Sequence, residues 1–387
     1  MRPLYFDYNA TTPVHPEVRD RLIPFLSESF GNPGCAHLPG MSAKDAVDQA
    51  RENAAAALGV SASSIVFTSG ATEANNLAVL GTAGPFAPEG RPERIAVSAV
   101  EHPAVFAPAR ALERRGSRMY VIPVDSQGAM DLDSLEQVCS SGGPGLLAVM
   151  LANNETGTLN PVREAAKIAK EHGWLVHCDA AQAVGKIPVD VAELGVDFLT
   201  VAGHKCYAPK GVGALVIASE EARKRIAPVT FGGGQEGGLR PGTENVPYIV
   251  ALGAALEIVC RKVADEEPRQ RALGNRFMAG LDDLGRPFRL FGKPFTEDAR
   301  LPQTANVGFA NVTAGSILSG LVAREVAVSG GAACHAGQVS ISTTLLAMNA
   351  PEQYAAGAVR FSWGIFTEEQ DVDELLLRLE ETLAELD

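Results

Sequence analysis

The chain has 387 residues, of which 46% are hydrophobic and 20% are charged, and its formal net charge is -13 at pH 7. This length exceeds one ordinary domain, so we expect a globular protein with one large and one smaller domain. The acidic balance argues against a surface for nucleic acid or an anionic membrane. Because no run of about 18 apolar residues occurs and the first residues lack an apolar signal-peptide core, we expect a cytoplasmic protein.

The six cysteines are widely spaced and form neither a CxxC pair nor a metal-ligand spacing. We therefore expect no disulfide framework and no bound metal ion. Cys35, Cys139, Cys178 and Cys260 are interpreted as small buried hydrophobic residues. Cys206 is ambiguous, because it directly follows a lysine.

The first forty residues begin with a strand-like piece at 4–7, followed by NATTP and by one helix near 17–27. Asn9, Thr11 and Thr12 are residue types typical of turns. The functional alternative is that this arm folds over a site and offers Asn9 to a substrate carboxylate.

An alanine-rich helical stretch at 40–58 precedes IVFTSGATEANNLAVLGTA, which predicts a strand, a glycine turn and a helix that begins close to Gly70. The amides of Gly70, Ala71 and Thr72 would lie at the helix N-terminus, where unpaired N–H groups and the helix dipole favour an anion. A simple N-cap by Ser69 or Thr72 would explain the same pattern. The turn is thus a candidate phosphate site.

Apolar runs of strand length follow, bounded by Gly, Pro or polar residues and separated by other segments. They cover residues 95–100, 146–151, 174–178, 197–202 and 212–218. Such runs are typical of strands in a sheet that is covered on both faces. In open α/β sheets, ligands bind outside the carboxyl ends of the strands. The polar residues at these ends are therefore candidate site residues: Thr72, His102, Asn154, Asp179, Gln182, His204 and Lys205.

Lys205 follows Gly-His and precedes a turn rich in Gly and Pro. A salt bridge between Lys205 and Asp179 would be a purely structural explanation. Lys205 could instead form a Schiff base with a carbonyl cofactor such as pyridoxal phosphate, while Asp179 pairs with the pyridinium nitrogen. A lone histidine after a strand is more often structural, but in such a site His102 would stack on the ring. Thr72, Ser69 or His204 would hold the phosphate.

The sequence FGGGQEGGLRPGTENVP at 231–247 contains six glycines, which exclude a helix or a central strand. A loop of this length inside a compact domain is usually functional or disordered. It precedes an apolar helix at 246–259. The end of the loop could present Thr243 to a phosphate, either within its own chain or across a dimer interface.

From about residue 261 the pattern changes to a charged helix at 261–284, short strands at TANVGFA, VAVSGG and AVRFSWG, and a last amphipathic helix that starts with TEEQ as a capping box. We therefore expect residues 16–260 to form the large domain. Residues 1–15 and 261–387 would form the smaller α+β domain.

Within the smaller domain, SGGAACHAGQ surrounds Cys334 with small residues, which is an unusual setting for a structural cysteine. Cys334 fits a thiol that attacks a substrate as the thiolate. Arg360, in the strand after this segment, fits a bidentate clamp for a substrate carboxylate.

Together these motifs resemble the cysteine desulfurase and selenocysteine lyase family, the pyridoxal-phosphate enzymes also called class V aminotransferases. The resemblance rests on ten ordered motifs that span nearly the whole chain: DYNATTP, FGNP, FTSGATEANN, EHPAV, NNETG, HCDAAQAVGK, GHKCYAPKGVGAL, FGGGQEGGLRPGTEN, SGGAACH and VRFSWG. It implies a homodimer of the fold-type I architecture, in which a large α/β domain with a mostly parallel seven-stranded sheet is joined to the small domain. It also implies pyridoxal 5'-phosphate as a Schiff base on Lys205.

The resemblance implies roles for individual residues. Lys205, Cys334 and His102 would be catalytic. Asn9 and Arg360 would bind the substrate. The other cofactor contacts would come from Ala71, Thr72, Asn154, Asp179, Gln182, Gly203, His204 and the partner subunit's Thr243.

The implied reaction converts L-cysteine to alanine while Cys334 takes the sulfur as a persulfide for an acceptor protein, which would dock near this residue. Several motifs look closer to selenocysteine lyases, which would release selenide from L-selenocysteine, yet the spacing after Cys334 resembles desulfurases, and we favour a desulfurase. Gly237 and Ile365 depart from the family pattern, which would affect pocket charge or acceptor docking. An aminotransferase or β-lyase on this fold would not need Cys334, and a non-catalytic scaffold for iron–sulfur assembly would not need Lys205.

Overall fold

The computed structural model describes residues 2–330 and 341–386. A seven-stranded sheet has the order β2-β8-β7-β6-β5-β3-β4. Its strands are β2 (Ile65–Thr68), β3 (Arg94–Ser98), β4 (Arg118–Ile122), β5 (Gly145–Met150), β6 (Leu175–Asp179), β7 (Phe198–Ala202) and β8 (Gly213–Ile217). All neighbours from β4 to β7 are parallel, whereas β8 is antiparallel to both β7 and β2. The predicted mostly parallel seven-stranded sheet is confirmed.

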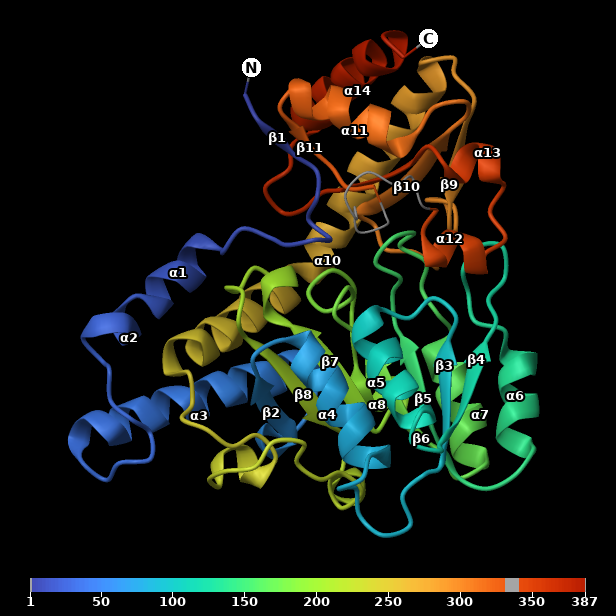
Figure 1. Ribbon diagram of the computed structural model, residues 1–387. Coiled ribbons are helices and arrows are strands. Elements are labelled where there is room, and N and C mark those ends of the chain that lie inside the picture. The colour runs from blue at the N-terminus through green and yellow to red at the C-terminus, as the bar shows by residue number, and fades with distance from the viewer. Residues whose placement is uncertain (1, 331–340, 387) are drawn as a thin grey trace.

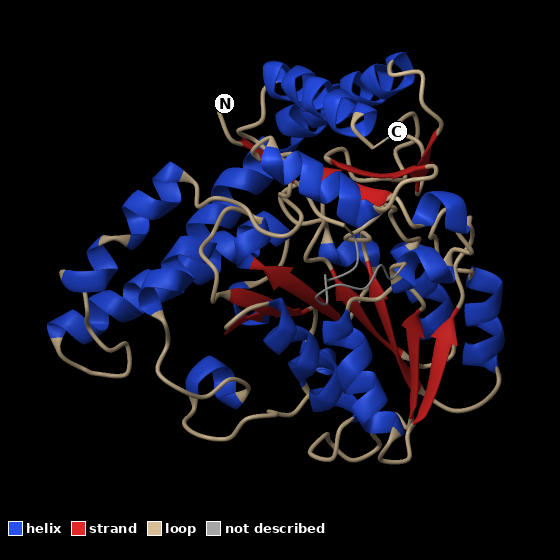
Figure 2. Ribbon diagram, turned by 45° about the horizontal axis from the view of Figure 1, so that its top comes forward, coloured by secondary structure: helices blue, strands red, loops and turns tan. Residues whose placement is uncertain are grey.

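Helices cover both faces of this sheet (Figures 1 and 2). One face packs against α4 (Ala71–Ala83) and α5 (Pro103–Glu113), and the other against α3 (Leu38–Leu58), α6 (Leu132–Ser140), α7 (Val162–Glu171) and the first part of α10 (Val246–Asp283). Strand β5 shows why its sequence is continuously apolar. Leu146 and Ala148 enter the core under α4 and α5, while Leu147 and Val149 enter the opposite core, so both faces of the strand are buried.

A second, smaller assembly has its own core. Its antiparallel sheet has the order β12-β10-β9, and a short parallel pair joins β1 to β11. The bounds are β1 (Leu4–Tyr5), β9 (Phe288–Phe291), β10 (Thr304–Phe309), β11 (Val326–Ala327) and β12 (Ala358–Ser362). The helices α11 (Ala314–Ala323) and α14 (Glu369–Ala384) pack with the second half of α10 over this core. The remaining helices are α1 (Pro16–Leu22), α2 (Pro24–Ser27), α8 (Val191–Leu194), α9 (Glu220–Arg223), α12 (Thr343–Ala347) and α13 (Glu352–Ala355).

Several predicted elements differ from the structure. The helix expected at 17–27 is two helices, because Pro24 occupies the first turn of α2 and lacks the N–H that would continue α1. The helices expected at 246–259 and 261–284 form the single helix α10. The predicted domain boundary at residue 260 lies inside α10 and stays a prediction.

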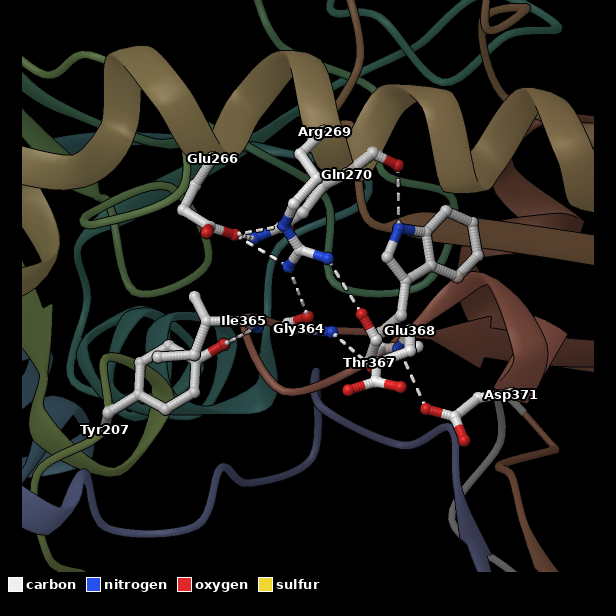
Figure 3. Close-up of polar contacts among 10 residues, drawn as sticks. Tyr207, Glu266, Arg269, Gln270, Gly364, Ile365, Thr367, Glu368 and Asp371 are labelled. Carbon is white, nitrogen blue, oxygen red and sulfur yellow. Dashed lines mark hydrogen bonds and ion pairs between the residues drawn. The ribbon is translucent and has the colours of Figure 1, made fainter.

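A turn after β12 holds the two cores together (Figure 3). Two of its carbonyls, those of Gly364 and Thr367, accept hydrogen bonds from the Arg269 guanidinium on α10, at 3.1 and 2.8 Å. The backbone N–H of Ile365 donates to the Tyr207 hydroxyl at 3.0 Å. Because Tyr207 is two residues from Lys205, this bond connects the small sheet to the segment that carries the predicted catalytic lysine.

The predicted capping box at 367–370 is shifted by one residue. Glu368 is the N-cap residue of α14 and exchanges hydrogen bonds with Asp371, while the Thr367 hydroxyl accepts from the N–H of Gly364 at 3.1 Å instead. The cysteine predictions hold for Cys139 and Cys178, which are buried; they are wrong for Cys35 and Cys260, which are half-buried. Among the helices of the described residues, none has the length and apolar character that a membrane span requires.

Candidate active site

A cavity of about 640 Å³ lies beyond the carboxyl ends of the central strands. Ten of the predicted site residues line it: Asn9, Ala71, Thr72, His102, Asn154, Asp179, Gln182, His204, Lys205 and Arg360. Gly203 and Thr243 do not line it, and Cys334 lies outside the described residues. The carboxyl ends of the central strands thus bring together most of these side chains, while Asn9 and Arg360 come from outside the seven-stranded sheet.

The N-terminus of α4 forms one end of the cavity. Gly70 is the N-cap residue, with φ 154° and ψ 176°, a backbone conformation that only glycine adopts readily. Because glycine offers no side-chain acceptor, the first-turn amides of Ala71 and Thr72 are not capped by a side chain. The alternative of an N-cap by Ser69 or Thr72 is therefore wrong, and the arrangement suits an anion.

Asp179 ends β6 and has two hydrogen-bond donors fixed around its carboxylate. The N–H of Ala181 donates to Oδ1 at 2.9 Å, and Asn75 Nδ2 donates to Oδ2 at 2.7 Å. Asn75 is fully buried on α4. Sequence analysis missed it, although the apolar helix around a buried asparagine is a signal that it has a polar partner. The carboxylate is thereby oriented before any ligand binds.

A second carboxyl group, Glu101, lies buried near Asp179 and was also missed. Its Oε1 accepts the N–H of Met150 at 2.6 Å, and its Oε2 has no partner among the described residues. Burial, and secondly the charge of Asp179, raise the pKa of Glu101 well above its usual value. The raised pKa favours the protonated form of this carboxyl group.

His102 is the N-cap residue of α5 and lines the cavity. Its Nδ1 accepts the N–H of Ala104 at 3.1 Å, so a neutral ring carries its proton on Nε2. Burial, followed by the positive charge of Lys205, lowers the pKa of His102. Burial and nearby lysines lower the pKa of His204 to about 4. Both rings are thus neutral at pH 7.

Lys205 lies in the turn after β7 and lines the same cavity. Burial lowers its pKa to about 8, with Arg360 contributing in the same direction and the charge of Asp179 opposing both. No hydrogen bond or ion pair from its amine to the described part of the chain is found. An amine with a lowered pKa and no competing partner is suited to attack a carbonyl group.

Arg360 and Asn9 enter the cavity from the smaller assembly. The Arg360 guanidinium donates to Asp7 Oδ1 at 2.7 Å and to the carbonyl of Asn154 at 2.9 Å. Asn9 Nδ2 donates to the same carbonyl at 3.2 Å and to Thr304 Oγ1 at 2.9 Å. The buried Nε of Arg360 and Oδ1 of Asn9 have no partner among the described residues. These unpartnered atoms are what a polar ligand would satisfy.

The described residues on either side of 331–340 also lie beside the cavity. Ser329 exchanges backbone hydrogen bonds with Arg360, at 2.7 and 3.2 Å. Thr344 Oγ1 donates to Glu155 Oε1 at 3.0 Å, one residue after Asn154. Described residues before and after this segment are thus bonded to Arg360, which lines the cavity, and to Glu155, the neighbour of Asn154.

Thr243 lies in the glycine-rich loop and is exposed in the single chain. The loop is anchored by Glu236, another residue that sequence analysis missed. Its carboxylate forms a bidentate pair with Arg51, at 2.7 and 2.9 Å, and accepts the N–H of Phe67 in the edge strand β2 at 2.9 Å. A buried carboxylate with three donors gives this glycine-rich stretch a fixed attachment.

A known protein family and its members match the chain along nearly its whole length. The family Aminotransferase class-V matches residues 4–375. The chain is 40% identical over 385 residues to cysteine desulfurase IscS of Dictyoglomus turgidum, covering 100% of this chain and 95% of the relative. It is 42% identical over 378 residues to a cysteine desulfurase of Gluconacetobacter diazotrophicus, covering 97% and 92%.

Solved structures agree. A NifS-like protein superimposes with a TM-score of 0.90 at 36% identity, covering 99% of this chain and 100% of that one. The structure titled SspA in complex with cysteine has a TM-score of 0.79 at 34% identity, covering 93% and 98%. The sheet and its cavity have the fold-type I architecture of pyridoxal-phosphate enzymes. The chain belongs to the class-V aminotransferase family, whose members depend on pyridoxal 5'-phosphate.

The residues of the cavity fit this cofactor. The uncapped amides of α4 match a phosphate group, the oriented carboxylate of Asp179 matches a protonated ring nitrogen, and the unpaired amine of Lys205 matches an aldehyde. When bound, pyridoxal phosphate supplies an aldehyde that captures amines and a ring that accepts electrons from the bond being broken.

Proposed function

We propose that this protein is a cysteine desulfurase that converts L-cysteine to L-alanine and transfers the sulfur to Cys334. The observation that carries the proposal is the single cavity in which Lys205, Asp179 and Arg360 meet beside both ends of the segment that contains Cys334. The relatives named cysteine desulfurase, which align along nearly the whole chain, support the same reaction.

In the proposed reaction, Lys205 holds the cofactor, Asp179 holds its ring nitrogen protonated, and His102 stacks on the ring. Ala71, Thr72, Gly203 and His204 hold the phosphate, while Asn154 and Gln182 contact the polar edge of the ring. Asn9 and Arg360 bind the substrate carboxylate, a role that their unpartnered buried atoms support. Lys205, once released by the substrate amine, moves the α-proton, since its pKa near 8 allows both protonation states.

The bonds that change in the sulfur transfer belong to the substrate and Cys334, while the cofactor would supply the electron sink that lets the carbon fragment leave. The Cys334 thiolate attacks the substrate sulfur, so that an S–S bond forms while the carbon–sulfur bond breaks. The electron pair of the broken bond stays with the carbon fragment, which gains a proton and leaves as alanine. The outer sulfur of the Cys334 persulfide is then transferred to an acceptor protein that docks on the smaller assembly. The process served is iron–sulfur cluster assembly.

The assembly proposed is a cytoplasmic homodimer in which each subunit's Thr243 contacts the phosphate of the other. Thr243 is exposed and does not line the cavity of its own chain, and both observations support this arrangement. Exposed apolar side chains on the projecting α1 to α3 segment support a further contact surface there: Ile23, Leu26, Phe30, Leu38 and Met41. We also propose the domain division into 16–260 and 1–15 with 261–387, which the two separate cores and the pairing of β1 with β11 support.

The second candidate is a selenocysteine lyase, in which selenide leaves without a persulfide on Cys334. The departures from the family pattern motivate this alternative. Gly237 has φ 61°, which favours glycine over an arginine there, and the side chain of Ile365 packs against the larger core. Neither position therefore supplies a positive charge near the cavity.

Alanine release from L-cysteine and from L-selenocysteine, by the cofactor-loaded protein and by Cys334→Ala, tests the proposal. Turnover of cysteine that the variant loses supports the desulfurase. Turnover of selenocysteine alone, unchanged in the variant, supports the lyase. Full turnover of cysteine by the variant contradicts both the persulfide and the role of Cys334, and favours an aminotransferase or β-lyase.

A further inference from the structure

Lys186 is a buried lysine behind the cavity wall that the proposed reaction does not use. It is 6% exposed, and its Nζ donates one hydrogen bond, to Gln182 Oε1 at 2.9 Å. No carboxylate of the described residues lies within ion-pair distance of it. Burial, together with the positive charges of Lys205 and Arg360, lowers its pKa to about 7, with Cys206 opposing. A buried amine with a single neutral partner is costly, so a specific use is expected.

The partner of Lys186 has both ends of its amide engaged. Gln182 Oε1 accepts from Lys186, and Gln182 Nε2 donates to the backbone carbonyl of Asn9 at 3.0 Å. An amide has two N–H donors on its nitrogen, so one remains free beside the cavity that Gln182 lines. Reversing the amide would place its N–H groups against the Lys186 donor and its oxygen against the Asn9 carbonyl.

We propose that Lys186 is a positioning residue for the cofactor, because its hydrogen bond to Gln182 Oε1 holds the Gln182 amide with an N–H directed into the cavity. That N–H is the donor for the ring oxygen of pyridoxal phosphate. The Lys186 donor and the Asn9 carbonyl acceptor together fix this polarity. The inference deepens the proposed function in the cofactor pocket, and it rests on cofactor binding rather than on the identity of the substrate.

The direction of the Gln182 amide has a spectroscopic consequence. A hydrogen-bond donor to the ring oxygen stabilises the ionised form of this oxygen. It thereby weakens the attraction between the oxygen and the proton on the nitrogen that joins the cofactor to the lysine. Losing the donor, or presenting an oxygen in its place, therefore favours the protonated form of the bound cofactor. The pH midpoint of its visible absorption band would move upward by about one unit, the size expected for one hydrogen bond to a charged group.

The experiment titrates the visible band of the cofactor-loaded protein, without substrate, in wild type, Lys186→Met, Gln182→Leu and the double variant. Methionine matches the length of lysine and lacks its donor. We expect each single variant to raise the midpoint by about one pH unit. We expect Lys186→Met to add nothing in the Gln182→Leu background, because Lys186 acts through Gln182. Val259→Ala is the control for loosened packing, since Val259 lies beside the turn at Gly185, and it should leave the midpoint unchanged.

Two results would overturn the inference. One is an unchanged midpoint in Lys186→Met while Gln182→Leu shifts it. The other is a Lys186→Met shift that persists undiminished in the double variant, which would mean that the lysine acts by its own charge. If Lys186→Met does not fold, Lys186→Gln tests the same point, because it removes the charge and keeps a donor for Gln182 Oε1. Its midpoint should stay near that of wild type, and a rise of about one unit would mean that the charge of the lysine is what matters. Since no turnover is needed, these outcomes are independent of whether alanine is released from cysteine.

Discussion

Asn75, in the second turn of α4, donates from Nδ2 to Asp179 Oδ2 at 2.7 Å, and neither side chain is exposed by more than 5%. The bond connects α4, whose N-terminus is suited to bind the phosphate, to Asp179, whose carboxylate is suited to bind the ring nitrogen. Two parts of the cofactor site therefore share one rigid connection, whose length is set by the packing of α4 on β6.

Replacing Asn75 by leucine should weaken cofactor binding and turnover. The change keeps the volume of the side chain but leaves Asp179 Oδ2 without its donor. A hydrogen bond to a charged group contributes about 1.5–3 kcal/mol, so kcat/KM should fall by about tenfold to a hundredfold. The matched control is Asn76→Leu, since Asn76 donates only to the Thr72 carbonyl in the same helix. Equal losses in both variants would show that the effect comes from the helix and not from Asp179.

The rate at which the apoprotein captures pyridoxal phosphate should depend on pH through Lys205. Its amine, with a pKa of about 8, must be neutral to attack the aldehyde. The capture rate should rise by about tenfold per pH unit below pH 8 and level off above it. Stopped-flow absorbance, with Lys205→Ala as the blank, measures this rate. A profile that still rises steeply to about pH 10, the range of an unperturbed lysine, would contradict the lowered pKa.

Glu101 should make the protein less stable as pH rises. Its folded pKa is raised, so its contribution to stability is fully present below the unfolded value of about 4.3 and is lost as pH increases toward the folded pKa. Glu101→Gln keeps an acceptor for the N–H of Met150 and cannot ionise. The advantage of this variant over wild type in urea unfolding should therefore grow from about pH 5 to about pH 8.

The control for Glu101 is Glu171→Gln, an exposed position at the end of α7, which should change stability little at either pH. If Glu101→Gln is less stable than wild type by the same amount at both values, Glu101 does not carry a proton in the folded protein.

The central strands and their polar carboxyl ends could be predicted because burial on both faces forces a continuous apolar run that stops where the site begins. The edge strands β4 and β9 were not predicted, because RMYVI and FRLF are each buried at one position only, the last, and lack that continuous apolar run. Asn75 and Lys186 escaped for a different reason. The contact of Asn75 with Asp179 depends on how α4 packs on β6, which sequence spacing does not encode. Lys186 is four residues from Gln182, but their contact forms in a turn and not in a helix, so no helical pattern indicates it.

Glu236, which bonds to the edge strand β2, is a further residue that sequence analysis missed and that mutation can test. Glu236 has φ 52°, a conformation that most residues avoid, and is kept in it by Arg51 and the N–H of Phe67. Glu236→Ala removes all three hydrogen bonds and leaves a partly buried guanidinium unpaired. Stability should fall by about 3 kcal/mol, the lower end for breaking a buried pair, because the Arg51 side chain keeps 18% exposure.

If the bidentate pair carries this loss, Arg51→Met should lower stability at least as much as Glu236→Ala, since it leaves the carboxylate of Glu236, the more buried partner, without its cation, and the double variant should be far from additive. Chemical denaturation of the four proteins measures the coupling. Glu220→Gln, at an exposed position in α9, is the control. Additive losses would mean that Glu236 serves the edge strand through Phe67 alone. In that case the exposed Thr243 end of the loop would not depend on Arg51, and cofactor retention in Arg51→Met should equal that of wild type.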